Sequence, residues 1–212
     1  MARFEGVVTV PLGEVRLEGE LVVPEEPQGI VLFAHGSGSS RHSPRNNAVA
    51  DSLRERGLAT FLFDLLTEEE DVVRETRFDI SLLTNRLAGA TRWIADHAET
   101  AGLPVGYFGA STGAAAAMCA ASERDIDVDA VVSRGGRVDM AGETATELDV
   151  PCLFIVGGED HDVLELNEET LAKLPGEKEL AIVEGAGHLF EGPGQLEEVA
   201  ALAGDWFVEH LG

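Results

Sequence analysis

From about residue 29 onward, apolar runs of strand length alternate with longer stretches whose apolar residues recur at helical spacing. This alternation is typical of consecutive strand–helix–strand units, in which parallel strands form a twisted sheet covered by helices on both faces. The expected strands are 29–34, 58–63, 105–108, 130–132, 152–156 and 180–183. The expected helices are 44–57, 78–99, 112–123, 163–174 and 195–210. The sequence therefore predicts an α/β fold.

The first residues follow a different pattern. Residues 3–10 and 15–23 have the alternating character of strands, and Pro11-Leu12-Gly13 separates them, so we expect an N-terminal antiparallel hairpin. No repeat, low-complexity segment or linker divides the chain, and we expect one domain over residues 1–212. The stretch between strand 130–132 and Cys152 is too short for a large lid.

The chain is strongly acidic, with 39 Asp and Glu against 15 Lys and Arg and a formal net charge of −24. Such a surface repels phosphate backbones and anionic lipid, so we expect neither nucleic-acid nor membrane binding. The acidic run 68–71 favours a solvated surface over a cation site. The excess of acids suggests adaptation to a salty cytoplasm, where salt screens the self-repulsion of the chain.

The sequence also predicts the cellular location of the protein and the redox state of its two cysteines. The N-terminus has no apolar core of a signal peptide, and no apolar run reaches the ~18 residues of a membrane span, so we expect a cytoplasmic protein. Cys119 and Cys152 both lie in apolar segments and are expected to be buried free thiols. The oligomeric state is expected to be a monomer or a small homo-oligomer.

A candidate nucleophile lies where an apolar strand meets an Ala-rich helix. Gly109-Ala110-Ser111-Thr112-Gly113 has the spacing Gly-x-Ser-x-Gly, in which the two glycines let strand and helix pass closely while Ser111 stands at the tip of a strained turn. The N–H of Thr112 points to the same space and can stabilise an oxyanion. The alternative is a Gly-rich turn whose serine only caps the helix.

A base and an acid follow in chain order. His188 lies on a Gly-rich loop after the last apolar strand, and Asp160 lies in a turn of acids after the preceding strand. The acid must accept the Nδ1–H of the base and stabilise the imidazolium. Asp162 and then Glu159 are the alternatives to Asp160; for Asp162 we favour a role as the cap of helix 163–174.

The loop after strand 29–34 supplies the other side of the site. Gly36 and Gly38 let the backbone turn, and Ser37 is the expected second oxyanion donor. A phosphate-binding loop is the rival interpretation, but the Gly-Lys-Ser/Thr of a P-loop is missing. We expect Gly36, Arg41 and Arg134 to contact substrate; the alternative for Arg41 is an ion pair with an acid such as Asp64, and Arg137 is a weaker candidate.

These motifs together resemble the dienelactone-hydrolase-like branch of the α/β-hydrolase superfamily. The matching residues run in the expected order and are 35–41, 109–113, 157–160 and 187–188. The resemblance implies a single-domain α/β-hydrolase fold and hydrolysis of carboxylic esters or lactones. Similar domains in this branch also occur fused to a phosphoribosyltransferase domain. This chain has Ser111 where true dienelactone hydrolases use Cys, which implies an esterase-like serine enzyme.

The sequence thus predicts a serine hydrolase that acts on a small ester through an acyl-enzyme, with Ser111, His188 and Asp160 as triad. No metal or organic cofactor is implied. A thioesterase or amidase would use the same groups, because fold and triad do not fix the substrate. A hydrolase-fold protein that binds a small ligand without turnover is the alternative from another class.

Overall fold

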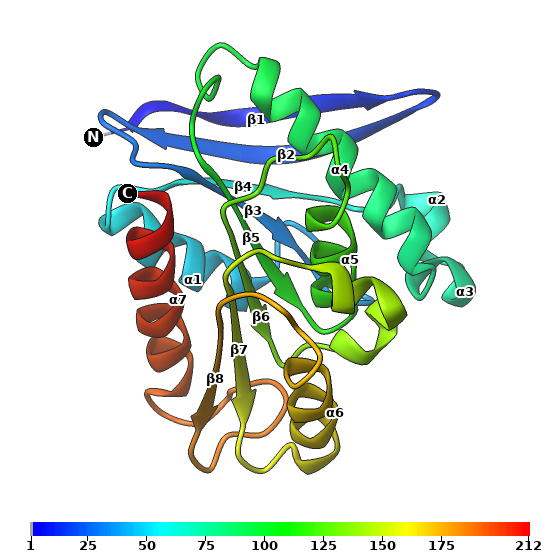
Figure 1. The fold of residues 1–212 in the computed structure, drawn as a ribbon. Coiled ribbons are helices and arrows are strands. Elements are labelled where there is room, and N and C mark those ends of the chain that lie inside the picture. Colours follow the sequence, from blue (N-terminus) through cyan, green and yellow to red (C-terminus); the bar gives the residue numbers. More distant parts are fainter. Residues whose placement is uncertain (1) are drawn as a thin grey trace.

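The computed structural model describes residues 2–212 and contains one sheet of eight strands in the order β1-β2-β4-β3-β5-β6-β7-β8 (Figure 1). The strands are β1 (Ala2–Leu12), β2 (Val15–Pro24), β3 (Ile30–Ala34), β4 (Ala59–Phe63), β5 (Val105–Ala110), β6 (Ala130–Arg134), β7 (Cys152–Gly157) and β8 (Lys178–Val183). β1 and β2 pair antiparallel, β2 joins β4 antiparallel, and all other pairs are parallel. The predicted hairpin and mostly parallel sheet are confirmed.

The helices form two layers. α1 (Pro44–Glu55) and α7 (Gln195–Leu211) cover one face, while α4 (Ile80–Asp96) and α5 (Thr112–Ala121) cover the other (Figure 1). α6 (His161–Leu171) and the 3₁₀ segment η1 (Val138–Glu147) lie at the α5 side of the sheet, and η1 packs against α5. Helices on both faces explain why the strands β3 to β7 are buried at every position, since neither face of these strands meets water.

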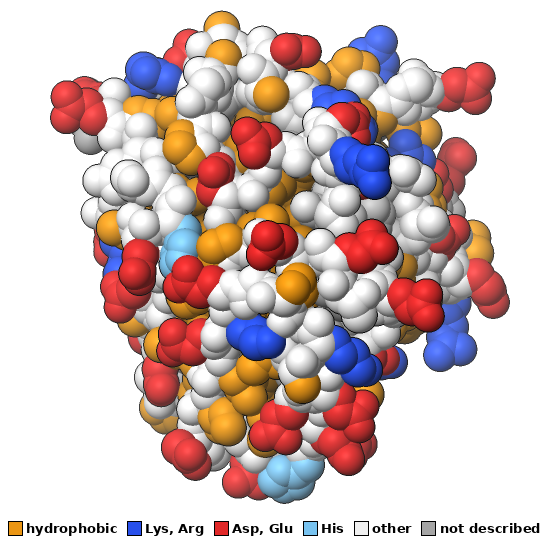
Figure 2. Space-filling model, in the orientation of Figure 1, with side chains coloured by type: hydrophobic (Ala, Val, Ile, Leu, Met, Phe, Trp, Pro, Cys, Tyr) orange, Lys and Arg blue, Asp and Glu red, His pale blue; other side chains and the backbone are white. Residues whose placement is uncertain are grey.

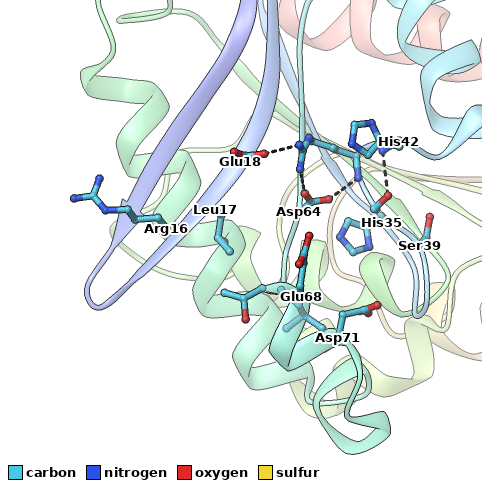
Figure 3. Close-up of a pocket in the computed structure, with 13 residues that line it drawn as sticks. Arg16, Leu17, Glu18, His35, Ser39, His42, Asp64, Glu68 and Asp71 are labelled. Carbon is cyan, nitrogen blue, oxygen red and sulfur yellow. Dashed lines mark hydrogen bonds and ion pairs between the residues drawn. The ribbon is translucent and has the colours of Figure 1, made fainter.

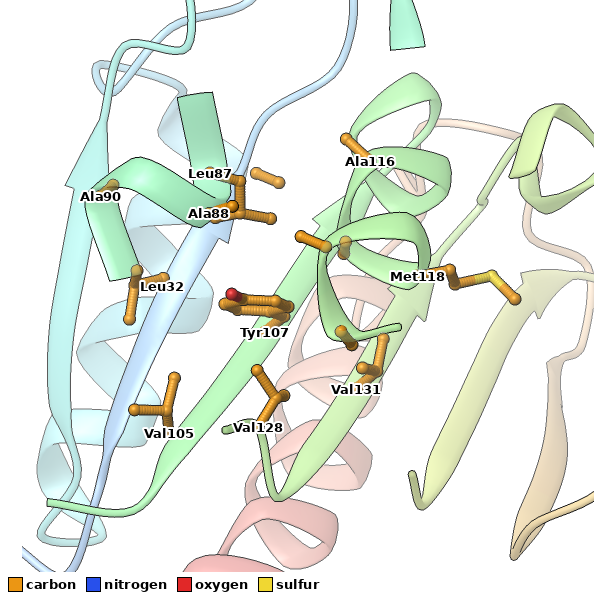
Figure 4. Close-up of a cluster of buried hydrophobic side chains, with 14 of the residues drawn as sticks. Leu32, Leu87, Ala88, Ala90, Val105, Tyr107, Ala116, Met118, Val128 and Val131 are labelled. Carbon is orange, nitrogen blue, oxygen red and sulfur yellow. The ribbon is translucent and has the colours of Figure 1, made fainter. Parts of the chain in front are cut away.

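The core under α4 and α5 centres on Tyr107 of β5 (Figure 4). Its ring is fully buried, and its hydroxyl lies 2.6 Å from the Thr91 hydroxyl of α4, so the one polar atom of this side chain is satisfied. Burial raises the pKa of Tyr107, which keeps the phenol neutral. The opposite core, under α1 and α7, includes Phe33, Phe108 and Phe207.

Helix boundaries are where the sequence-based expectations were least accurate. The helix expected over 163–174 begins at His161, and the one expected over 78–99 is Ile80–Asp96. The acidic run 68–71 forms a short helix α2 (Glu68–Asp71), because Thr67 and Glu70 make a reciprocal capping box and acids favour a helix N-terminus. A second short helix, α3 (Arg74–Arg77), follows; neither was expected.

The surface agrees with the composition. Figure 2 shows acidic side chains scattered over the visible face, with few basic ones between them. None of the described helices is both long and apolar enough to span a bilayer.

Both cysteines are free thiols. Cys152 is buried, as predicted, and burial raises the pKa of its thiol to about 12. Cys119 is only half-buried, so the prediction of burial was wrong for this residue.

Candidate active site

The turn from β5 into α5 places Ser111 in a strained conformation. Its φ is 51° and its ψ is −121°, a region that residues other than glycine rarely occupy. The flanking glycines are needed because a Cβ at Gly113 would lie 2.1 Å from the Ala34 carbonyl oxygen, and one at Gly109 would lie 2.5 Å from the Ala114 Cα. The Ser111 side chain does not cap α5. Ser111 therefore occupies a strained strand-to-helix turn and is not a helix cap.

The predicted base and acid contact each other. Nδ1 of His188 lies 2.7 Å from Oδ2 of Asp160, which is a charge-assisted hydrogen bond when the ring donates. His188 lies on the loop after β8, and Asp160 lies between β7 and α6. Glu159 lies 4.0 Å from His161 instead, and Asp162 lies in the first turn of α6 rather than capping it. Asp160, our first choice among the three candidate carboxylates, is therefore the one that contacts the His188 ring.

The pair stands at the same sheet edge as Ser111. The Ser111 N–H donates to the Arg134 carbonyl at 3.3 Å, at the end of β6. The next residue, Gly135, lies under the His188 ring: a Cβ there would be 3.5 Å from both Cε1 and Nδ1. The Ser111 hydroxyl and His188 are not hydrogen-bonded to each other in the structure. Such bonds are often open without substrate and tighten when substrate binds.

The loop after β3 reaches Ser111. A Cβ at Gly36 would lie 3.1 Å from the Ser111 Cβ, so the loop backbone touches the elbow. The N–H of Thr112 is the first of α5 and has no acceptor within the helix. The N–H of Ser37, however, donates to the Thr112 hydroxyl at 3.0 Å. An oxyanion could use the Ser37 donor only by sharing it with that hydroxyl or displacing it.

A buried histidine holds this loop, and the sequence analysis did not assign it a role. His35 accepts the Leu65 N–H through Nε2 at 3.0 Å, so its proton is on Nδ1, which lies 3.0 Å from the Gly36 carbonyl oxygen. Burial lowers the pKa of His35 below its usual 6.5 and keeps the ring neutral. The sequence feature that could have indicated this role is the position of His35, directly after the buried strand β3 and before the Gly-rich turn.

The arginines differ in what surrounds them. Arg41 forms ion pairs with Asp64 and Glu18, so the structure favours the internal partner that we gave as the alternative to substrate. Arg137 pairs with Asp139 at 2.8 Å. Arg134 is 9% exposed, and its Nη1 has no hydrogen-bond partner among the described residues. Of these three arginines, Arg134 is therefore the one without an ion pair among the described residues.

A cavity of about 510 Å³ opens beside the β3 loop, between β2, the end of β4 and α2 (Figure 3). His35, Ser39, Ser40 and Arg41 of the loop line it together with Glu18, Asp64, Glu68 and Asp71. Leu17 and Leu66 are its two apolar side chains. This volume suits a small ligand, and the lining suits a polar one. Among the described residues, no cluster of three His, Cys, Asp or Glu side chains could hold a metal ion.

Comparison with known proteins agrees with this architecture. The structure superposes on dienelactone hydrolase from Anabaena variabilis with a TM-score of 0.95, at 53% sequence identity over 99% of both chains. Est1E from Butyrivibrio proteoclasticus has the same fold at a TM-score of 0.82, with 16% identity over 97% of this chain and 99% of that one.

Two curated relatives from strains of Mycobacterium tuberculosis are each 57% identical over 204 residues and are named putative phosphoribosyl transferase. The match covers 96% of this chain but 46% of each relative, so the chain spans less than half of their length. Residues 27–201 match the family described as alpha/beta hydrolase domain. The chain belongs to the alpha/beta hydrolase family and is dienelactone-hydrolase-like in fold and sequence.

Proposed function

We propose that the chain is a serine hydrolase of small carboxylic esters or lactones, with Ser111 as nucleophile, His188 as base and Asp160 as the residue that orients the base. The observation that carries this proposal is the 2.7 Å contact between His188 and Asp160, beside the strained elbow of Ser111. Three residues from distant parts of the sequence share one sheet edge, which a helix-capping serine would not require.

The proposed reaction has two acyl-transfer steps. His188 takes the Ser111 proton through Nε2 while the Ser111 oxygen attacks the ester carbonyl, and the imidazolium that forms is stabilised by Asp160. Collapse of the tetrahedral intermediate breaks the ester C–O bond, and His188 returns the proton to the leaving alcohol. Water, deprotonated by His188, then attacks the acyl-enzyme and releases the acid and Ser111. A lactone follows the same steps, with both products in one molecule.

The oxyanion of both intermediates would be held by backbone donors. The N–H of Thr112 is at the positive end of α5 and is free of intrahelical bonds. The Ser37 N–H joins it once the carbonyl oxygen competes with the Thr112 hydroxyl. We propose that Gly36 lines the acyl site because its backbone touches Ser111.

The cavity beside the β3 loop is polar, but Ser111, His188 and Asp160 do not line it, so it does not define the acyl site. Two of its lining side chains are apolar, and the rest are charged or hydrogen-bonding. Thioesters and amides could be cleaved by the same groups, and the name of the similar dienelactone hydrolase favours lactones and the related carboxylic esters.

The name of the mycobacterial relatives does not transfer to this chain. Those proteins are more than twice as long as the part of them that matches this chain. This chain contains the Gly-x-Ser-x-Gly pattern that is typical of hydrolases. We therefore propose hydrolysis, not phosphoribosyl transfer, for this chain.

The test compares the unaltered chain with Ser111→Ala, using 4-nitrophenyl acetate and a fluorophosphonate probe. We expect turnover and covalent labelling of the unaltered chain and loss of both in the variant. Turnover that survives the substitution unchanged would refute the assignment. Absence of both turnover and labelling in the unaltered, folded chain would favour the alternative of a ligand-binding protein.

A further inference from the structure

A fully buried asparagine on α6 connects this helix to the turn that follows β6. The side chain of Asn167 is 0% exposed, and Val163 and Thr170 are the other two buried residues of α6. Asparagine is a poor helix former, and a buried polar side chain is costly unless it is hydrogen-bonded. An apolar residue would suit this position of the helix better, so the reason for an amide here must lie in its hydrogen bonds.

The amide nitrogen of Asn167 uses both of its donors. Nδ2 donates to the Gly136 carbonyl at 2.8 Å and to the Val163 carbonyl at 2.7 Å. The opposite orientation would bring the amide oxygen against two carbonyl oxygens, so the orientation of the group is fixed. Oδ1 is buried and has no partner among the described residues. The bond to Val163 stays within α6, whereas the bond to Gly136 reaches a different part of the chain.

The Gly136 carbonyl belongs to a turn that touches both Ser111 and His188. The next residue, Arg137, donates its N–H to the Ser111 carbonyl at 3.0 Å. The preceding residue, Gly135, has a φ of 51° and lies against the His188 ring, where a Cβ would be 3.5 Å from Cε1 and from Nδ1. The turn 135–137 therefore supports the strained serine at one end and the imidazole at the other.

The same helix carries the carboxylate that contacts the ring. Asp160 is the N-cap residue of α6, and its Oδ2 lies 2.7 Å from Nδ1 of His188. The Asp160 carbonyl accepts the Leu164 N–H at 2.8 Å, which fixes its backbone to the first turn of the helix. Through Asp160 and the Asn167 bond, α6 thus determines the position of two groups that contact the His188 ring.

We propose that Asn167 is a positioning residue for the reaction. It acts through the Gly136 carbonyl: it holds the turn 135–137 against His188 and Ser111 while α6 presents Asp160. The effect of Asn167 on turnover rests on the proposed hydrolase function. Its effect on the orientation of the His188 ring does not.

Two substitutions on α6 separate this role from general stability. Asn167→Leu removes both donors and keeps a side chain of similar size. Thr170→Val is the matched control, because Thr170 is 5% exposed and its hydroxyl donates at 2.8 Å to the Leu166 carbonyl of the same helix. Each variant loses a buried hydrogen bond, so both should have a lower midpoint of thermal unfolding. Asn167→Leu alone should alter the active site.

The kinetic readout is the turnover of 4-nitrophenyl acetate. We expect kcat of Asn167→Leu to fall by about 10- to 100-fold, because a small displacement of the base slows the proton transfers. We expect its KM to change by less than about twofold, because both acyl-transfer steps use the same ring. Thr170→Val should keep both constants. An unchanged kcat in Asn167→Leu would overturn the proposal, as would an equal loss in Thr170→Val.

A second readout needs no turnover. Long-range ¹H–¹⁵N spectra of the imidazoles are recorded at a pH where the histidines are neutral, and His188→Gln identifies the signal of residue 188. In the unaltered chain we expect a single tautomer with the proton on Nδ1, facing Asp160. In Asn167→Leu we expect the two ring nitrogens to shift towards a mixture of tautomers, whereas Thr170→Val should keep the original shifts.

Unchanged ¹⁵N shifts in Asn167→Leu would contradict the control of the ring by Asn167. The expected change of shifts, together with absence of turnover and of fluorophosphonate labelling in the unaltered chain, would refute the hydrolase function alone. The two failures are therefore distinguishable.

Asn167→Asp keeps the proposal testable if Asn167→Leu does not fold. The new carboxyl has the size of the amide, but it offers one donor when protonated and none when ionised, and the ionised form would place an oxygen against each carbonyl. The ratio of its kcat to that of the unaltered chain should be below one and should fall further as the pH rises. Titration of His188 affects both proteins, so the ratio reports on residue 167. A ratio close to one at every pH would reject the proposal.

Discussion

Nδ1 of His188 lies 2.7 Å from the carboxylate of Asp160, and this contact joins the loop after β8 to the turn after β7. In the proposed mechanism the carboxylate fixes the tautomer of the ring and stabilises the imidazolium. Asp160→Asn should therefore lower kcat for 4-nitrophenyl acetate by on the order of 10⁴, because an amide favours the wrong tautomer.

Asp162→Asn is the matched control for that change. Asp162 lies two residues further on, is exposed, and belongs to the first turn of α6. We expect its kcat to remain close to that of the unaltered chain. Equal losses in the two variants would mean that the acidic turn acts through general electrostatics and not through the contact with His188.

The buried ring of His35 should make stability depend on pH. Its pKa is lowered from 6.5 in the folded state by burial, so its contribution is fully present above pH 6.5. Below pH 6.5 the unfolded chain binds a proton that the folded chain does not, and the free energy of unfolding falls until the folded pKa is reached.

His35→Gln removes this titration while keeping an oxygen that can accept the Leu65 N–H. We expect the free energy of unfolding of His35→Gln, measured by urea titration, to decline less steeply than that of the unaltered chain as the pH falls below 6.5. The many carboxylates titrate in both proteins, so the difference in slope reports on residue 35. Identical slopes would contradict a neutral His35.

The ion pair of Arg41 with Asp64 should contribute measurably to stability. The two side chains are 16% and 20% exposed, so solvent screens them only in part. A double-mutant cycle of Arg41→Ala and Asp64→Ala should give a coupling free energy of about 1–2 kcal/mol. The same cycle on Arg92 and Asp125, which are 47% and 68% exposed, should give less than about 1 kcal/mol. Equal coupling in both pairs would argue against a structural role for Arg41.

The close passage of α5 over β3 should make residue 113 intolerant of any side chain. A Cβ at Gly113 would lie 2.1 Å from the Ala34 carbonyl oxygen, so the helix or the strand would have to move. Gly113→Ala should lower the free energy of unfolding by about 3 kcal/mol or more. Gly6→Ala, where the nearest atom would be 3.6 Å away, should change it by less than about 0.5 kcal/mol. A small effect at position 113 would show that the elbow is more plastic than its contacts imply.

Much of the fold could be predicted because apolar periodicity reports burial directly. Strands such as 29–34 and 152–156 are apolar at every position, which only a sheet covered on both faces allows. The Gly-x-Ser-x-Gly turn was equally predictable, since Gly109 and Gly113 are required by close contacts with Ala114 of the same turn and with Ala34 of β3. Helix ends were less predictable: the Thr67 side chain bonds back to the backbone at the start of α2, whereas Asp160, at the N-cap of α6, makes no such bond and contacts His188 instead.

The sequence by itself determined the order of sheet and helix units, the glycine-flanked Ser111 and the three carboxylates from which Asp160 was chosen. Only the tertiary structure decided which charges meet. It paired Arg41 with Asp64 and Glu18, placed the Ser37 N–H on the Thr112 hydroxyl, and left the buried Arg134 without an ion pair among the described residues. The physical reason is that periodicity along a chain encodes burial, whereas the partner of a charged side chain is set by residues that are distant in sequence and neighbours only after folding.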